Sequence, residues 1–180
     1  HGGKDAWIVR VSTSGVPILA KCFGGTNNDI ANSIKQTVDS GYIIGGVTYS
    51  NNGNVSGNHG NGDAWVFKLN RDGEMQWQRC YGGNGYEEIN SISPSLGGGY
   101  IFAGYTTSNN SGNVGPNHGN GDMWVCKITD TGTILWQTCL GGSKKDIATT
   151  IYEASPGIYI VTGHTKSDDG DVSHNKGEND

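Results

Sequence analysis

Strong helix formers are scarce in this sequence. Met occurs 2 times in 180 residues and Leu and Glu are few, whereas the strand-favouring residues Ile, Val, Thr, Tyr and Trp are plentiful. This composition excludes a mostly helical protein. The glycines follow no strict Gly-X-Y period, which excludes a collagen, and the apolar content is that of a globular chain rather than of a disordered tail.

Three further absences limit the partners. Lys and Arg are scattered singly and the formal net charge is −5, so the basic face that nucleic-acid binding requires is missing. No apolar run approaches the roughly 20 residues that span a bilayer, so we expect no membrane insertion. Neither an initiator Met nor a signal peptide stands at the start, which leads us to expect a chain processed or excised from a larger protein.

Glycine, in contrast, is abundant, with 31 residues, and an internal repeat explains the excess. The block at 59–65 returns at 118–124 and has a first copy at 1–7. The Trp residues that close these blocks lie 58 and 59 positions apart. The sequence therefore predicts repeats over 1–58, 59–117 and 118–175, with 176–180 as the start of a truncated next repeat.

One unit shows the period-2 alternation of half-buried strands, separated by Gly-containing tight turns. In the second unit the predicted strands cover 65–69, 74–81, 89–93 and 100–106. Four short strands joined by tight turns form an antiparallel meander, which is how a β-propeller blade is built. We therefore expect an all-β protein of three four-stranded antiparallel propeller-type blades of 58–59 residues. The alternative is a β-trefoil, which also has three four-stranded repeats.

The repeated residues resemble a known repeat class. The stretch Trp65-Val66-Phe67-Lys68-Leu69, then Gly73 through Gly83, then Gly98 through Gly104 is similar to the SBBP-like β-propeller repeat of large secreted bacterial and archaeal surface proteins. The third unit departs from the pattern, because it reads Pro156-Gly157-Ile158-Tyr159 where the others have Gly-Gly-Tyr. The resemblance implies an extracellular or cell-surface, non-catalytic role in adhesion or display.

Carboxylates recur at two positions of each unit. Asp63 and Asp122 stand two places before a Trp, and Glu87 and Asp146 follow a Gly-Gly pair. Paired carboxylates can hydrolyse glycosides when they share one cleft. A catalytic pair would break the repeat, however, whereas these acids recur in every unit. We therefore interpret them as turn caps that accept backbone N–H bonds.

The long loops carry the other candidate residues. Asp168, Asp169 and Asp171 surround a Gly in the third loop, and such oxygens can gather around calcium. Asx turns explain the same pattern, and no bidentate Glu follows at EF-hand spacing. We expect no resident cofactor, with calcium in this loop as the open alternative.

Residues that could bind a ligand lie in the equivalent loops, because loops on a rigid scaffold commonly carry binding. They are Tyr49, Asn54, His59, Tyr105, Asn113 and His118. No CxxC or HxxxH pair indicates zinc, and the four cysteines are predicted to be free and mostly buried. Trp77 and Trp136 are predicted to be core residues.

These observations predict a secreted or cell-surface module for adhesion, display or interaction with a glycan or surface protein. Its other partners would be repeats of the same or an identical chain. Two further hypotheses remain, an extracellular glycan-acting hydrolase and a structural spacer or filament-forming repeat.

Overall fold

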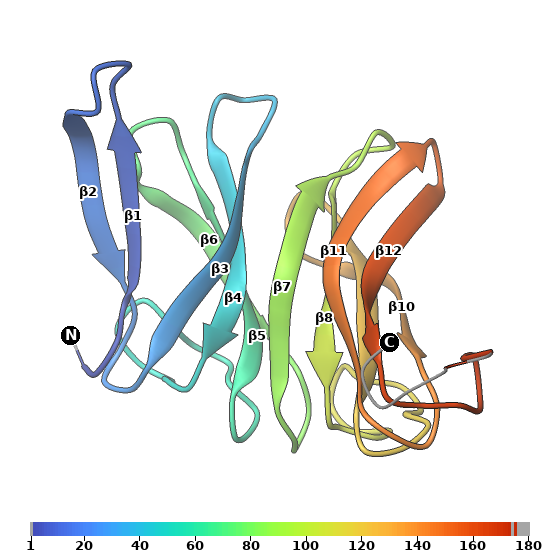
Figure 1. The fold of residues 1–180 in the computed structure, drawn as a ribbon. Coiled ribbons are helices and arrows are strands. Elements are labelled where there is room, and N and C mark those ends of the chain that lie inside the picture. Colours follow the sequence, from blue (N-terminus) through green and yellow to red (C-terminus); the bar gives the residue numbers. More distant parts are fainter. Residues whose placement is uncertain (1, 174, 176–180) are drawn as a thin grey trace.

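The computed structural model describes residues 2–173 and 175, and every regular element in them is a strand (Figure 1). The prediction of an all-β protein is confirmed. The predicted start of a next repeat at 176–180 lies outside the described residues. The strands are β1 (Ala6–Val11), β2 (Pro17–Phe23), β3 (Asp29–Gln36), β4 (Tyr42–Thr48), β5 (Asp63–Leu69), β6 (Met75–Tyr81), β7 (Glu87–Pro94), β8 (Tyr100–Thr106), β9 (Asp122–Ile128), β10 (Ile134–Leu140), β11 (Asp146–Ser155) and β12 (Ile158–Thr165).

The strands form four antiparallel sheets, in the orders β1-β2, β3-β4-β5-β6, β7-β8-β9-β10 and β11-β12. This grouping differs from the expected three sheets of four, because each four-stranded sheet takes two strands from one repeat and two from the next. The short segment 82–86 carries the chain from β6 into the neighbouring sheet, while the long loop 107–121 joins two neighbours, β8 and β9. The length of a connection therefore does not show whether the two strands that it joins are paired.

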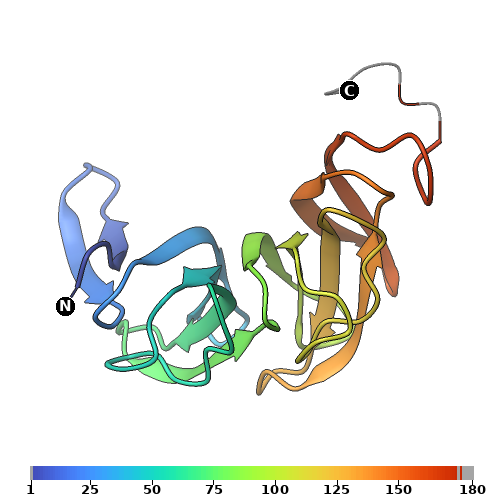
Figure 2. The ribbon, with the colours of Figure 1, turned by 90° about the horizontal axis from the view of Figure 1, so that it is seen from below.

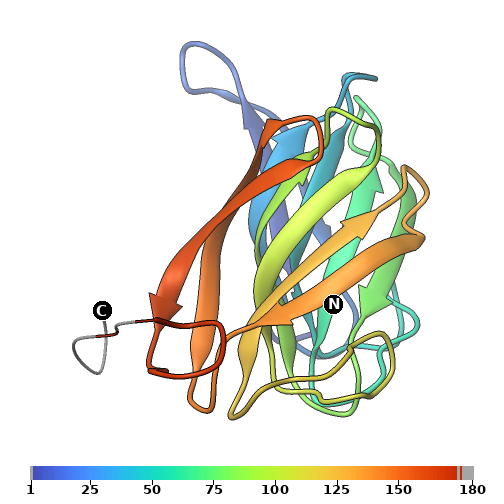
Figure 3. The same cartoon turned by 90° about the vertical axis from the view of Figure 1, so that its right-hand side faces the viewer.

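The sheets follow one another along an open arc (Figure 2). The first strand of each of the last three sheets lies on the inner side, where β7 packs against β3 and β4, and β11 against β7 and β8. Tight hairpin turns gather at one end of the sheets and the longer connections at the other (Figures 1 and 3). We call the second end the loop face; it consists of segments 24–28, 49–62, 82–86, 107–121 and 141–145.

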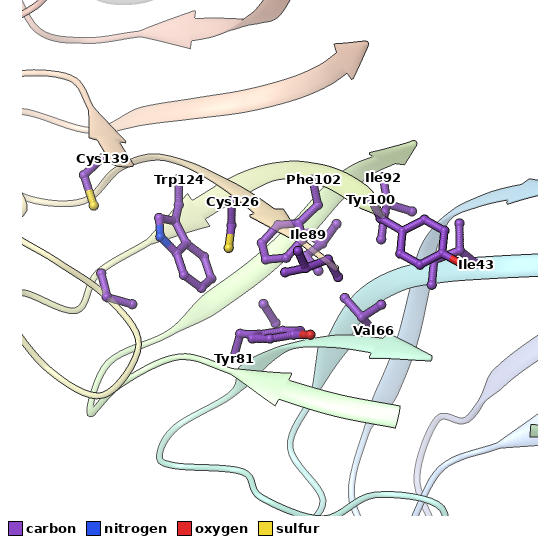
Figure 4. Packing of buried hydrophobic residues seen from close by; sticks show 13 residues of the cluster. Ile43, Val66, Tyr81, Ile89, Ile92, Tyr100, Phe102, Trp124, Cys126 and Cys139 are labelled. Carbon is purple, nitrogen blue, oxygen red and sulfur yellow. The ribbon is translucent and has the colours of Figure 1, made fainter. Parts of the chain in front are cut away.

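The space between the two four-stranded sheets is filled by a large apolar cluster (Figure 4). Phe102 packs edge-on against Trp124, and Tyr81 from the facing sheet lies 5.6 Å from Phe102 between ring centres. The indole of Trp124 is fully buried, and its Nε1 donates to Gln137 Oε1 at 2.9 Å. Burial of a large aromatic side chain with a satisfied N–H makes this cluster the main stabilising contact between sheets.

Bulges in the inner strands β3 and β7 link neighbouring sheets. The register shifts beside Asn32 in β3 and beside Asn90 in β7, which leaves these residues without a partner on the adjacent strand. Asn32 Nδ2 instead donates to the carbonyl of Ile89, and Asn90 Nδ2 to the carbonyl of Ala148, both at 2.9 Å. The extra residue of the bulge thus aims an amide at the next sheet.

The two tryptophans predicted to be core residues differ in their burial. Trp77 is partly buried and packs against the core cluster, but Trp136 is 40% exposed, so its assignment to the core was wrong. Trp77 is covered by the β9–β10 turn at Gly132, whereas Trp136 faces β11-β12, a sheet that has no strands equivalent to β9 and β10. The four cysteines are free as predicted, and Cys22 is the exposed one.

Candidate functional site on the loop face

A buried carboxylate closes each unit at the loop face. Glu87 is fully buried at the start of β7; it accepts hydrogen bonds from Thr106 Oγ1 at 2.8 Å, Gly83 N at 2.9 Å and Ser108 N at 3.2 Å. Asp29 and Asp146 accept the equivalent glycine and threonine bonds in the other units, and in place of the serine N–H they accept the hydroxyl of the equivalent serine. The interpretation of these acids as caps is confirmed, since a buried carboxylate with three donors fixes the segments that supply them.

A second buried carboxylate holds a histidine in the second and third units. Asp63 Oδ2 lies 2.5 Å from Nδ1 of His59 and also accepts the His59 backbone N–H. Asp122 and His118 repeat this geometry at 2.6 Å. Both aspartates are fully buried, whereas each imidazole is about two-fifths exposed. His59 and His118 are therefore oriented residues with one ring edge fixed and the other facing solvent.

The pKa values of an aspartate and of a histidine in these pairs are both raised, for different reasons. Burial raises the pKa of Asp63 above its usual 3.8, and the neighbouring charge of Glu87 acts in the same direction, while the hydrogen bonds from His59 oppose both. The hydrogen bond to Asp122 raises the pKa of His118 above its usual 6.5 despite partial burial. Protonated His118 is thus stabilised by folding.

We expect His118 to make stability depend on pH. Because its folded pKa is raised, its contribution is fully present below pH 6.5 and is lost as the pH rises through the raised value. The melting temperature of His118→Gln should therefore fall less than that of the unmodified chain between pH 6 and pH 8. A neighbouring loop residue that does not titrate provides the control, and Asn120→Gln should keep the original slope. An unchanged slope in His118→Gln would contradict the assignment.

The loop residues Asn54 and Asn113, predicted to bind a ligand, also hold the backbone. Each is bonded in both directions to a glycine, since its N–H donates to the Gly24 or Gly82 carbonyl and its Oδ1 accepts from the same residue's N–H. Asp171 makes the equivalent pair of bonds with Gly141. These three predicted site residues therefore secure each long loop to the Gly-Gly segment of its own unit.

The other two acids of the third loop also have partners. Asp169 Oδ1 accepts a hydrogen bond from Ser143 N at 2.7 Å, which lowers the pKa of Asp169, and Asp168 lies 3.4 Å from Lys144 Nζ. Within residues 2–173 and 175, no three His, Cys, Asp or Glu side chains are grouped as metal ligands. Calcium binding here stays a prediction.

His59 opens into a hollow of about 610 Å³, between β6 and the β9–β10 turn, that Asn113, Arg79 and Cys80 also line. A smaller hollow contains His118 and Cys139. Burial and the charges of Asp63 and Asp29 raise the pKa of Cys80 to about 12, and burial likewise raises that of Cys139 to about 12. A nucleophilic cysteine requires a lowered pKa, so these thiols are packing residues.

A third hollow is built around a tyrosine that the other repeats do not have. It has a volume of about 550 Å³, lies between the first two sheets, and contains the ring of Tyr49, which is 38% exposed. Thr107 and Lys166 replace this tyrosine in the other repeats. The remaining lining residues are Gly3, Thr26, Asn27, Asn28, Gly60 and Asn61.

Tyr105 belongs to a row of aromatic rings beside this hollow. Tyr86 lies 6.2 Å from Tyr49 and 6.4 Å from Tyr105 between ring centres, and Lys145 Nζ is 4.6 Å from the centre of the Tyr105 ring. Tyr105 itself is buried, and its hydroxyl donates to the carbonyl of Asn120. Tyr105 therefore packs against Tyr86 at the buried end of the row.

Tyr86 and Asn28 were missed by sequence reasoning. They occupy the same position of two repeats, where the third has Lys145. A comparison of the repeats for departures rather than agreements would have found them. No protein-family model matches the chain, and a search of curated proteins finds no match. In the described part of the chain, no helix is long and apolar enough to cross a membrane.

Proposed function

We propose that the chain is a non-catalytic, propeller-type repeat module that acts outside the cell or at its surface and binds a carbohydrate on its loop face. The sheets would be the blades, and the last three of them each have an inner strand toward one axis, an arrangement that favours a propeller over a trefoil. The SBBP-like repeat pattern supports the extracellular setting. Part of the loop face would contact a glycan or a glycosylated surface protein.

The Tyr49 hollow carries this proposal. An aromatic ring with one open face can stack on the apolar face of a sugar, while surrounding amide, hydroxyl and backbone groups bond its hydroxyls. Thr26, Asn27 and Asn28 supply such groups next to Tyr49. The site also breaks the repeat, as expected for a position that serves recognition rather than folding.

The alternative of a glycan-acting hydrolase receives less support. Glu87 and its equivalents use both oxygens to accept hydrogen bonds from their own unit, and the acids next to them orient a histidine. A retaining or inverting hydrolase needs one pair of carboxyl groups free to face the substrate. Asp63 and Asp122 bond their histidine through Oδ2, and their Oδ1 atoms have no hydrogen-bond partner among the described residues but are buried rather than facing an open cleft.

A glycan array followed by titration tests the proposal. The unmodified chain should retain at least one glycan class, and Tyr49→Ala should weaken that binding about tenfold or more, because the stacking surface is removed. Tyr152→Ala provides a matched control, since Tyr152 is 51% exposed on β11, outside the residues of the loop face. Equal binding by Tyr49→Ala, or retention of no glycan by the unmodified chain, would reject the site.

A further inference from the structure

Each of the two end sheets corresponds to one half of a complete four-stranded sheet. The sheet β11-β12 corresponds to the first two strands, and β1-β2 to the last two. In the complete sheets, β4 pairs with β5 and β8 with β9, each through seven residue pairs. By position in the repeat, β12 is equivalent to β4 and β8, and β1 is equivalent to β5 and β9. In the described part of the chain, β12 pairs only with β11 and β1 only with β2, so each has one open edge.

Side chains along these edges are exposed where their equivalents are buried. Trp7 on β1 is 68% exposed, whereas Trp65 and Trp124 are 0% exposed. Ile160 on β12 is 41% exposed, whereas Ile43 at the same position of β4 is fully buried. The apolar sequence of the edges thus matches that of strands that have neighbours on both sides.

In each complete sheet we call the first two strands inner and the last two outer. The inner strand β3 likewise has no pair of inner strands in the sheet before it. Ile92 on β7 and Ile151 on β11 are 0% and 3% exposed, because each packs against the two inner strands of the preceding sheet. Ile34, their equivalent on β3, is 44% exposed. The sheet before β3 contains only β1 and β2, which are outer strands. A partner that fills the gap must therefore bring two inner strands, not a single peptide strand.

The chain carries such a pair, β11 and β12, with the required hydrogen-bonding group. Ser33 Oγ accepts the N–H of Ile92 on the next inner strand, and Ser91 Oγ accepts that of Ile151, both at 3.2 Å. Thr150 occupies this position on β11 and keeps a hydroxyl, which is exposed. It is placed to accept the equivalent N–H of a β3 strand.

The open edge of β12 also lacks the residues that prevent strands from pairing. Exposed edge strands are commonly protected by Lys or Pro. The outer strand β2 contains Pro17 and Lys21, and the outer strand β6 contains Arg79, whereas the outer strand β10 contains no Lys, Arg or Pro. β12 reads Ile-Tyr-Ile-Val-Thr-Gly-His-Thr and contains no Lys, Arg or Pro. Such an edge is a template for strand addition.

We propose that β12 pairs with β1 of a second copy of this chain, in the register of β4 with β5 and β8 with β9. Ile160 would then face Arg10, and Gly163 would face Trp7 of the second copy. The result is a four-stranded sheet, β11-β12 of one copy followed by β1-β2 of the other, packed on β3 of the second copy. The two end sheets lie toward the same side of the arc (Figure 2).

Mixed chains that each have one introduced, exposed cysteine besides the three buried ones test the register directly. The exposed Cys22 is first changed to serine. A chain with Ile160→Cys is then mixed with a chain that carries Arg10→Cys and oxidised mildly. The mixture should give a disulfide-linked heterodimer in preference to either homodimer, because opposed residues of paired strands lie within disulfide range. Replacing Arg10→Cys by Ser14→Cys, in the β1–β2 turn, is the control. Cross-linking that is equal for both partners, or absent for both, would overturn the proposal.

Light scattering over a range of protein concentrations tests the association itself. The unmodified chain should form a dimer or a larger assembly, and Ile160→Lys should weaken it about tenfold or more, because a charge would be buried without a partner. Leu135→Lys introduces the same charge at an exposed site on β10 and should leave the mass unchanged. A monomeric unmodified chain at all concentrations would overturn the proposal. If Ile160→Lys fails to fold by circular dichroism, the cross-linking result decides.

Discussion

Replacing Trp65 by alanine is expected to lower the free energy of unfolding by about 3–5 kcal/mol. The indole is 0% exposed, its ring lies 4.3 Å from that of Phe67 between centres, and its Nε1 donates to Gln78 Oε1 at 3.1 Å. The substitution opens a cavity in the core and removes the donor from the partly buried amide oxygen of Gln78. Urea denaturation measures the loss as a lower midpoint at an unchanged slope.

Trp136 provides the matched comparison. Its ring is 40% exposed and contacts Tyr159, so Trp136→Ala should cost about 1 kcal/mol or less. Similar losses for the two variants would contradict the assignment of Trp65 to the core and of Trp136 to the surface.

Gly104→Ala is expected to destabilise the chain by about 3 kcal/mol, or to prevent folding. A Cβ at this position would lie 2.8 Å from the carbonyl carbon of Glu88 and closer still to its oxygen. These are backbone atoms at the β7 bulge, so no side-chain rotation relieves the overlap. Gly46 and Gly163 meet the same obstacle at Ile30 and Ile147, which explains why this glycine recurs.

Gly97→Ala is the control for that substitution. No atom lies within 4 Å of a Cβ added there, and Gly97 has no positive φ. Thermal and urea unfolding of this variant should match the unmodified chain within about 0.5 kcal/mol. A Gly104→Ala chain that is equally stable would show that β8 does not approach β7 this closely.

The strands themselves were predictable from alternation and turn residues. The range predicted as 100–106 is β8 unchanged, and the range predicted as 65–69 is β5 without its first two residues. The pairing of strands was not predictable in this way, because a period of two reports which face is buried and not which strand lies alongside. The segment 82–86 is short, yet it crosses between sheets.

The candidate site was predictable only where it repeats. His59 and His118 were found by comparing units, and the His-x-x-x-Asp spacing to Asp63 could also have indicated their partner. Asn54 and Asn113 were found for the same reason, but recurrence in their case reflects a backbone contact. Tyr86 was missed because it stands alone among the units. Recurrence identifies what the fold needs, and departure from it identifies candidates for recognition.

The offset between repeat and sheet has a consequence for how such a chain can change length. Every four-stranded sheet is assembled from the end of one unit and the beginning of the next. Duplication or deletion of one whole unit, wherever its limits fall, therefore adds or removes one complete sheet. The two-stranded sheets at the ends keep the same open strand edges. The proposed strand pairing between copies is therefore the same for any number of units.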